Sequence, residues 1–371
     1  MKKRIFKNIE WGILICTILL ISIGLVALFS ATQNSQYDEF KKQIIWLCIS
    51  IPIFIVILFI DYEIVAKAAP VFYGIIIVLL IGVLFTQPVN GAKSWFGVGT
   101  LSFQPSEFAK IFVIITFALV ITKIQSKGER GKKEISRPTR LILSLLVIIV
   151  PVGLIVLQPD LGTAIAFFVA TVMMLIAAGI DKKYIIVGLL LIVISIPLLY
   201  FFILPEHAKT RIDVYLNPNL DPRGSGYNII QSKLAIGAGQ LFGMGILKGN
   251  QTQLGFLYPK TTDFIFSVIG EEMGFVATAA IVILYVILIT KAIYVAKTAK
   301  DDLGSYIAMG IAGIFLFHMI ENIGMTIGLL PITGVPLPFV SYGGSSLLTN
   351  LILIALLLNI SGRRQKAIFI E

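Results

Sequence analysis

The chain has 371 residues, of which 57% are hydrophobic and 13% are charged, and its formal net charge is +10. Soluble domains are usually about 25% charged, so this composition excludes an ordinary soluble enzyme. It indicates an integral membrane protein, and we expect a single polytopic domain over residues 1–371.

Uncharged apolar stretches of about bilayer-spanning length, on the order of 20 residues, recur along the chain. The clear ones are Trp11–Ser30, Ile44–Ile60, Ala68–Phe85, Leu141–Leu157, Leu161–Ile180, Tyr184–Leu204, Met273–Thr290 and Phe339–Ile360. Two others are less regular, because Ile111–Thr122 is short and Tyr306–Leu330 contains His318 and Glu321. The sequence therefore predicts an all-α membrane protein with about ten transmembrane helices.

Basic residues provide a check on this topology, because short cytoplasmic loops retain Lys and Arg. With ten spans and a cytoplasmic N-terminus, most of the 30 basic residues fall in the inner segments 1–7, 61–67, 123–140, 181–183, 291–302 and 361–371. We therefore expect both termini in the cytoplasm. We interpret the positive charge as a consequence of membrane topology and not as a sign of nucleic-acid binding. The first apolar run is long and lacks an A-x-A-like cleavage site, so we expect a retained span.

Three outer segments are too rich in polar residues, glycine and proline to be simple connections. They are residues 90–110, a large loop over residues 205–263, and residues 328–346. Non-helical backbone near a membrane is tolerated where protein buries it or where it lines a wet cavity. We therefore expect these segments to form one outward-facing cavity, and the large loop to contain short interfacial or re-entrant helices.

Charged residues inside the predicted helices need partners or a function. Glu107 and Lys110 lie three residues apart on one helix face, where they either neutralise each other or contact a substrate. His318, Glu321 and Asn322 also share a face. For this trio we favour hydrogen bonding between helices over a proton path.

The segment YPKTTDFIFSVIGEE, residues 258–272, places Asp263 where a membrane helix begins. A carboxylate there either interacts with the helix macrodipole or serves as a general base. Glu271 lies about two turns further on and broadly on the same face, whereas Glu272 lies on the far side. Glu271 is either a buried hydrogen-bonding group or part of a site.

Two further patterns supply polar groups on the outer side. Gln231 and Lys233 lie off the apolar stripe of residues 228–239, which form either an interfacial helix or a packed loop helix. The segment FVSYGGSS, residues 339–346, combines hydroxyls with two glycines that permit close backbone approach. It is either the start of a helix with an N-cap serine or, as we favour, part of the cavity lining.

Several long blocks carry a resemblance over almost the whole chain. They are FQPSEFAK (103–110), QPDLGTA (158–164), DPRGSGYNIIQSKLAIGAGQLFGMG (221–245), TTDFIFSVIGEEMGF (261–275) and NIGMTIGLLPITGVPLPFVSYGGSS (322–346). In these blocks the sequence resembles the SEDS (shape, elongation, division and sporulation) family. KGNQTQL (248–254) and GMTIGLLPITG (324–334) are most similar to its RodA branch of rod-elongation peptidoglycan polymerases.

The resemblance implies a membrane glycosyltransferase that polymerises lipid II, the undecaprenyl-pyrophosphate-linked precursor, on the outer face of the bacterial cytoplasmic membrane. It also implies a class B penicillin-binding protein, a transpeptidase, as partner within the lipid bilayer. The family's catalytic aspartate falls on Asp263. Many relatives have a Pro-Glu pair and a His shortly before this aspartate, whereas this chain has Pro259, Lys260 and Thr261 there, which puts any proton relay through those groups in doubt.

Inverting transfer from a lipid pyrophosphate needs a general base on the acceptor hydroxyl, and one carboxylate can serve. The leaving pyrophosphate needs positive charge, for which Lys110, Arg211 and Lys233 are candidates. A divalent cation, Mg²⁺ or Mn²⁺, is a further candidate for which the sequence has no dedicated ligand motif. The predicted substrate-binding residues are Glu107, Lys110, Arg211, Gln231, Lys233, Thr262, Glu271, Ser341, Tyr342, Gly343, Gly344 and Ser345.

Two functions from other classes are alternatives. A transporter that flips lipid-linked precursor would suit many spans and intramembrane carboxylates, but it calls for a midplane site and repeat symmetry. A noncatalytic scaffold for the transpeptidase would tolerate Asp263→Ala without loss of cell shape or partner binding. The concentration of polar residues on the predicted outer side favours the polymerase.

Overall fold

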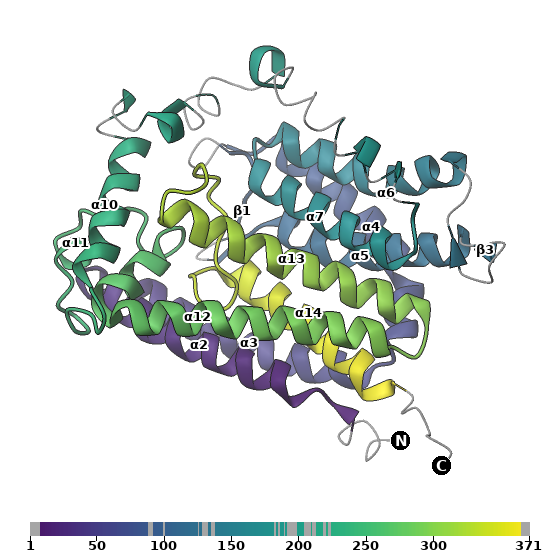
Figure 1. The fold of residues 1–371 in the computed structure, drawn as a ribbon, viewed down its shortest axis with the longest axis horizontal. Coiled ribbons are helices and arrows are strands. Elements are labelled where there is room, and N and C mark those ends of the chain that lie inside the picture. Colours follow the sequence, from purple (N-terminus) through teal and green to yellow (C-terminus); the bar gives the residue numbers. More distant parts are fainter. Residues whose placement is uncertain are drawn as a thin grey trace.

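Long helices that pack side by side make up most of the computed structural model (Figure 1). The structure describes residues 8–87, 92–98, 101–124, 126–127, 133–134, 138–181, 183–184, 186–188, 190, 199–203, 209, 213–217, 220–221 and 224–364. The main helices are α2 (Trp11–Ala31), α3 (Asp38–Phe59), α4 (Tyr62–Val83), α5 (Pro105–Ile124), α6 (Pro138–Leu157), α7 (Leu161–Ala177), α12 (Ile265–Thr298), α13 (Asp302–Thr326) and α14 (Gly344–Arg363), and a shorter helix, α10 (Ser225–Ala238), lies between α7 and α12 in the sequence.

Short elements connect these helices. They are the single turns η1 (Gln33–Ser35), η2 (Leu199–Ile203) and α11 (Asn250–Gln253), and the two antiparallel strand pairs β1 (Phe96–Val98) with β2 (Leu101–Phe103) and β3 (Ser126–Lys127) with β4 (Lys133–Glu134). The first pair lies within the outer segment 90–110. Helices α10 and α11 confirm that the large loop contains short helices, whereas their interfacial or re-entrant position stays a prediction.

The helical membrane architecture predicted from the sequence is confirmed. Within the described residues, six helices are long and apolar enough to cross a membrane, and two shorter apolar helices accompany them. The predicted span Tyr184–Leu204 lies largely outside the described residues, so the count of ten stays a prediction. The span predicted over Ile111–Thr122 is short because its helix, α5, begins at Pro105 and includes the charged residues that interrupted the apolar run.

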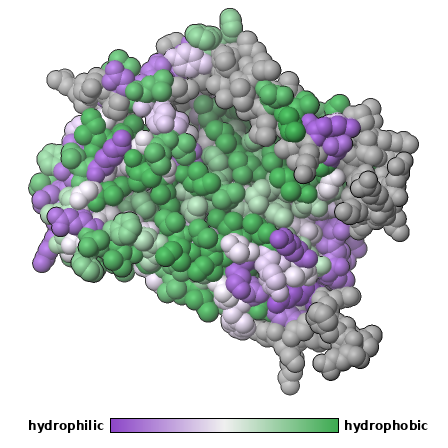
Figure 2. All heavy atoms as spheres, in the orientation of Figure 1, coloured by the Kyte–Doolittle hydropathy of each residue, from purple (hydrophilic) through white to green (hydrophobic). Residues whose placement is uncertain are grey.

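Helix α13 lies in the interior of the bundle, between α7 and α12 (Figure 1). Small residues allow this close packing: a Cβ at Gly313 would lie 2.7 Å from Ala170 Cα, and one at Gly310 would lie 2.8 Å from side-chain atoms of Ile114 and Met174. Small residues are the usual means by which membrane helices approach closely. The face drawn in Figure 2 is covered by a broad band of hydrophobic side chains, as a lipid-facing surface requires.

Helix α12 contains one residue outside helical geometry, Gly274, with φ 75° and ψ −173°. The backbone of residues 240–245 crosses the helix here: Phe275 N donates to Gln240 O at 2.8 Å, and Met244 N donates to Glu271 O at 2.9 Å. These bonds satisfy backbone groups that the break in α12 leaves without helical partners. They also fix the large loop to the bundle.

The end of the bundle that carries both chain termini is held by polar contacts. Ser361 Oγ donates to Asn8 O at 3.0 Å, and Arg363 pairs with Asp61 at 3.3 Å. Asn359 Nδ2 donates to Ile57 O at 2.7 Å and Leu58 O at 3.1 Å, and it also contacts Ile60 O. Because the last carbonyls of a helix lack helical donors, Asn359 caps α3.

The approach of α2 to residue 340 generates a stability prediction. A Cβ at Gly24 would lie 2.6 Å from Val340 Cα, so Gly24→Ala forces backbone to move and we expect a loss of about 1–3 kcal/mol. Gly74 in α4 has nothing within 4 Å of such a Cβ, so Gly74→Ala should be neutral or stabilise by up to about 1 kcal/mol. Thermal unfolding in detergent measures both, and equal midpoints for the two variants would contradict the packing argument.

Candidate functional site

A cavity of about 940 Å³ lies at the end of the bundle opposite the chain termini. Parts of all three predicted outer segments line it, together with the α2–α3 connection. Its polar and aromatic lining residues include Asn34, Glu39, Trp95, Gln104, Glu107, Asp160, Thr163, Lys260, Thr261, Thr262, Asp263, Thr333, Tyr342 and Ser346. The volume is at the upper end of ligand sites, which run to roughly 1,000 Å³.

Several helices begin at this cavity, among them α5, α7 and α14. Gln104 and Glu107 line it from the start of α5, Thr163 from the start of α7, and Gly344 from the start of α14. The N-terminus of a helix carries partial positive charge and favours anions. The geometry therefore gives the cavity a source of positive potential that does not depend on basic side chains.

Asp263 lies in the cavity wall, two residues before α12 begins. Its backbone carbonyl accepts a hydrogen bond from Asn322 Nδ2 at 3.0 Å. Its side chain faces Gly334, because a Cβ at that glycine would lie 3.5 Å from Asp263 Oδ2. Gly334 has φ +76°, a conformation that strains other residues, so the backbone of this wall favours glycine.

The residues before Asp263 are held by the segment that precedes α14. Tyr342 N donates to Thr261 O at 2.9 Å, and Ser341 Oγ donates to Thr262 O at 2.7 Å. Ser341 is buried and absent from the lining, whereas Tyr342 and Thr262 contribute to it. Two of the three predicted outer segments therefore determine each other's position.

One face of α13, formed by His318, Glu321 and Asn322, holds the loop that contains Gly334. Each of these residues makes one hydrogen bond to it: His318 Nδ1 with Pro336 O at 3.0 Å, Glu321 Oε1 with Thr333 Oγ1 at 2.7 Å, and Asn322 Nδ2 with Val335 O at 2.9 Å. The sequence favours bonding between helices for this trio. The structure shows a mainly different use, because a loop and not a helix supplies these partners.

Glu107 and Lys110 form a buried ion pair of 2.8 Å beside the cavity. Thr349 Oγ1 donates to Glu107 Oε2 at 3.1 Å, and Lys110 Nζ lies 3.4 Å from His318 Nε2. An ammonium group can only donate, so Nε2 of His318 is the acceptor and Nδ1 carries the proton directed at Pro336 O. Glu107 lines the cavity, whereas Lys110 is fully buried behind it.

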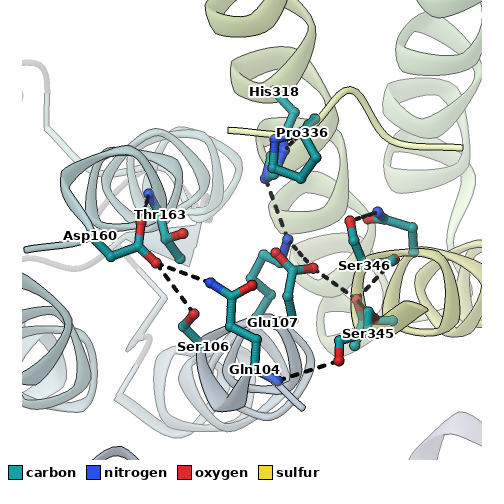
Figure 3. Close-up of polar contacts among 12 residues, drawn as sticks. Gln104, Ser106, Glu107, Asp160, Thr163, His318, Pro336, Ser345 and Ser346 are labelled. Atoms are coloured by element: carbon teal, nitrogen blue, oxygen red, sulfur yellow. Dashed lines mark hydrogen bonds and ion pairs between the residues drawn. The ribbon is translucent and has the colours of Figure 1, made fainter. Parts of the chain in front are cut away.

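Asp160 is a cavity residue that the sequence analysis did not assign to the site. Its Oδ2 accepts from Gln104 Nε2 at 3.3 Å and Ser106 Oγ at 3.4 Å, and its Oδ1 accepts from Thr163 N at 3.2 Å (Figure 3). Burial raises the pKa of the Asp160 carboxyl, and the hydrogen bonds from Thr163 offset this in part. Like Asp263, it stands directly before an apolar stretch, and this signal could have identified it.

Lys260 is another cavity residue that the sequence analysis did not assign to the site. Its Nζ donates to Thr252 O at 2.8 Å, and burial lowers the pKa of its ammonium group. Among the lining residues within the described part of the chain, it is the sole lysine or arginine. The sequence marked Lys260 as a departure from relatives, although its charge was a usable signal.

Several predicted substrate-binding residues lie elsewhere. Glu271 is buried away from the cavity lining, where its carboxylate accepts from Gln251 N at 2.6 Å and from Thr252 N at 3.0 Å. Gln231 and Lys233 lie on α10, also outside the lining. Arg211 falls outside the described residues, and its role stays a prediction.

The remaining predicted residues belong to the start of α14. Gly343 and Gly344 line the cavity. Ser345 is buried, accepts from Gln104 N at 3.3 Å and donates to Ser102 O at 3.4 Å, so that it joins α14 to the first outer segment. No group of three or more His, Cys, Asp or Glu residues suited to a metal occurs within the described residues, and the divalent cation stays a prediction.

The fold and this cavity define a polytopic membrane protein with a polar site at one end of its helices. A family model described as "Cell cycle protein", for the FtsW, RodA and SpoVE proteins, matches residues 10–366. The chain belongs to this family, as the resemblance of its motifs indicated.

Known relatives agree with this assignment. The chain is 37% identical over 339 residues to the peptidoglycan glycosyltransferase MrdB of Escherichia coli (strain K12), with 91% of this chain and 88% of that one covered. It is 32% identical over 440 residues to the peptidoglycan glycosyltransferase RodA of Treponema pallidum (strain Nichols), with 98% and 100% covered. One solved structure concerns the structural coordination of polymerization and crosslinking by a peptidoglycan synthase complex. A chain in that structure is similar to this chain, with a TM-score of 0.81 and 28% sequence identity, and the match covers 95% of this chain and 97% of that one.

The buried ion pair generates a second stability prediction. Lys110→Met leaves the Glu107 carboxylate without its counter-charge in a dry environment, so we expect a loss of about 3–5 kcal/mol in thermal or denaturant unfolding. The double variant Glu107→Gln, Lys110→Met should recover much of it. Lys291→Met removes a more exposed pair with Glu10 and should cost at most about 1 kcal/mol. Equal losses for Lys110→Met and Lys291→Met would contradict this interpretation.

Proposed function

We propose that this protein is a peptidoglycan glycosyltransferase that polymerises lipid II into glycan strands during rod-type elongation of the cell wall. The observation that carries the proposal is the position of Asp263: its carboxylate lies in the wall of a large cavity at which several helices begin. The relatives named peptidoglycan glycosyltransferases support the reaction class.

In the proposed reaction, Asp263 takes the proton from the acceptor sugar hydroxyl as its oxygen attacks the anomeric carbon of the donor. The new C–O bond forms while the bond to the lipid pyrophosphate breaks, and the pyrophosphate leaves with the electron pair. One base is sufficient, because this leaving group needs no proton. The attack from the opposite face inverts the anomeric centre.

Positive charge near the pyrophosphate would come from Lys260 and from the starts of α5, α7 and α14. Lys110 is a weaker candidate for direct contact, since its ammonium group is already paired with Glu107 behind the lining. We also propose that Glu271 supports the 250–253 turn and does not contact substrate, because its oxygens accept from that turn.

We place the protein in the bacterial cytoplasmic membrane with its cavity on the extracytoplasmic face and its termini inside. Every segment that lines the cavity is one that the charge pattern assigns to the outer side. A class B penicillin-binding protein is the proposed partner, in line with the peptidoglycan synthase complex in which a similar chain occurs. The resulting order is polymerisation by this chain and crosslinking by the transpeptidase.

The cavity favours a polymerase over a transporter of lipid-linked precursor. Its lining residues gather at the ends of helices and not at mid-span. The deeper polar residues His318, Glu321 and Asn322 are hydrogen-bonded to a loop, whereas alternating access calls for a binding site near the membrane midplane.

Polymerisation of fluorescent lipid II in detergent by the purified protein with its cognate transpeptidase tests the proposal. We expect a glycan ladder from wild type and none from Asp263→Ala or Asp263→Asn, with folding and partner binding retained. Asp181→Asn, which changes an exposed aspartate paired with Lys183, should polymerise normally. Normal polymerisation by the Asp263 variants, or no polymer from an intact wild-type complex, would sink the proposal.

The lowered pKa of Lys260 predicts a pH effect. Its ammonium group loses its proton at a lower pH than an ordinary lysine, so the KM for lipid II should rise on the alkaline side as positive charge is lost. Lys260→Arg should remove that rise, and Lys260→Met should raise KM roughly 10-fold at neutral pH and leave it independent of pH on the alkaline side, where wild type approaches it. Lys248→Met, a change at an exposed lysine outside the lining, is the control. A wild-type KM for Lys260→Met across the pH range would exclude contact with the pyrophosphate.

A further inference from the structure

Asn322 connects the backbone at Asp263 to the loop that faces it. The residue is fully buried on α13, and its Nδ2 donates to Asp263 O at 3.0 Å and to Val335 O at 2.9 Å. A primary amide has two N–H groups, so both donors of Asn322 are used. Its Oδ1 has no partner among the described residues, which indicates that the amide serves here through its donors.

The carbonyl of Asp263 precedes the hydrogen-bond ladder of α12. The first bonds of that helix run from Ser267 N and Val268 N to Phe264 O, at 3.0 and 3.2 Å. Backbone groups ahead of a helix in an apolar bundle need donors from elsewhere in the protein. Asn322 supplies one to Asp263 and so fixes the residue from which the carboxylate projects.

The loop end of this connection, at Val335, is also held by neighbouring residues. Val335 lies between Gly334, which faces the Asp263 carboxylate, and Pro336, whose carbonyl accepts from His318 Nδ1. His318 is in turn positioned by Lys110 on the neighbouring helix α5. The loop is therefore attached to the bundle at several residues. Among these attachments, Asn322 also contacts the Asp263 backbone.

We propose that Asn322 is a positioning residue for the reaction: by holding Asp263 O and Val335 O together, it sets where the Asp263 carboxylate stands in the cavity. This role rests on the proposed function of Asp263 as the base. A proton path through Asn322 is disfavoured by its contacts, because both N–H groups point to backbone carbonyls, which do not take up protons at neutral pH.

The test compares Asn322 with a second buried asparagine that makes the same kind of contact far from the cavity. Asn359 is also fully buried and donates to backbone carbonyls, at the end of the bundle that carries the termini. Asn322→Asp and Asn322→Leu remove the two amide donors from the site, and Asn359→Asp removes the matched donors at the other end. The protein is assayed as its complex with the transpeptidase.

The readout is kcat and KM for lipid II, with kcat expressed per binding site determined by titration with fluorescent lipid II. We expect the Asn322 variants to lose roughly 100-fold in kcat, the effect of about 1 Å of misplacement, with KM within about twofold of wild type. Asn359→Asp should lower the unfolding temperature and leave kcat per binding site unchanged. A purely structural role for Asn322 would lower the number of binding sites and not kcat per site.

Asn322→Asp is isosteric and provides the decisive measurement if the leucine variant does not accumulate. A kcat per site within about twofold of wild type, or an equal loss in Asn359→Asp, would overturn the positioning role. Asp263→Asn is measured in parallel. If it polymerises like wild type, the proposed function fails as well; if it is inactive while the Asn322 variants are normal, the positioning role alone fails.

Discussion

Backbone that leaves a helix inside an apolar bundle must find its hydrogen-bond partners within the protein, because lipid offers none. In this protein two such segments, residues 258–264 and 333–342, meet in the cavity wall and satisfy each other through Thr261, Thr262, Ser341 and Tyr342. The polar face of α13 supplies further donors. The position of Asp263 is therefore a consequence of backbone satisfaction, to which residues 333–342 and the polar face of α13 both contribute.

Charged side chains, like backbone groups, must find their partners within the protein. Within its described residues the cavity lining has four carboxylates, on Glu39, Glu107, Asp160 and Asp263, and a single basic side chain. Glu107 is neutralised by a lysine buried behind it, so that this pair adds little net field. An anionic substrate would then depend on the helix N-termini and on Lys260, and the proposed site has a focused anion-binding region and not a generally basic surface.

The sequence predicted the features that depend on composition and spacing, whereas it missed those that depend on long-range contacts. The apolar spans, the Glu107–Lys110 pair and the segments that line the cavity follow from hydropathy, residue type and polar content. Helical spacing put Glu271 broadly on the Asp263 side, but it could not show that residues 250–253 fold over that carboxylate. Nor could spacing show that Lys260 faces the cavity.

The central claim is that Asp263 acts on the acceptor sugar of lipid II as the general base. A structure of the Asp263→Asn variant with its transpeptidase and lipid II would test this claim most directly. We expect the acceptor hydroxyl within about 2.6–3.2 Å of the side chain at position 263, with the pyrophosphate beside Lys260 and the helix starts. Lipid II bound outside the cavity, for example against α10, with no contact to residue 263, would contradict it.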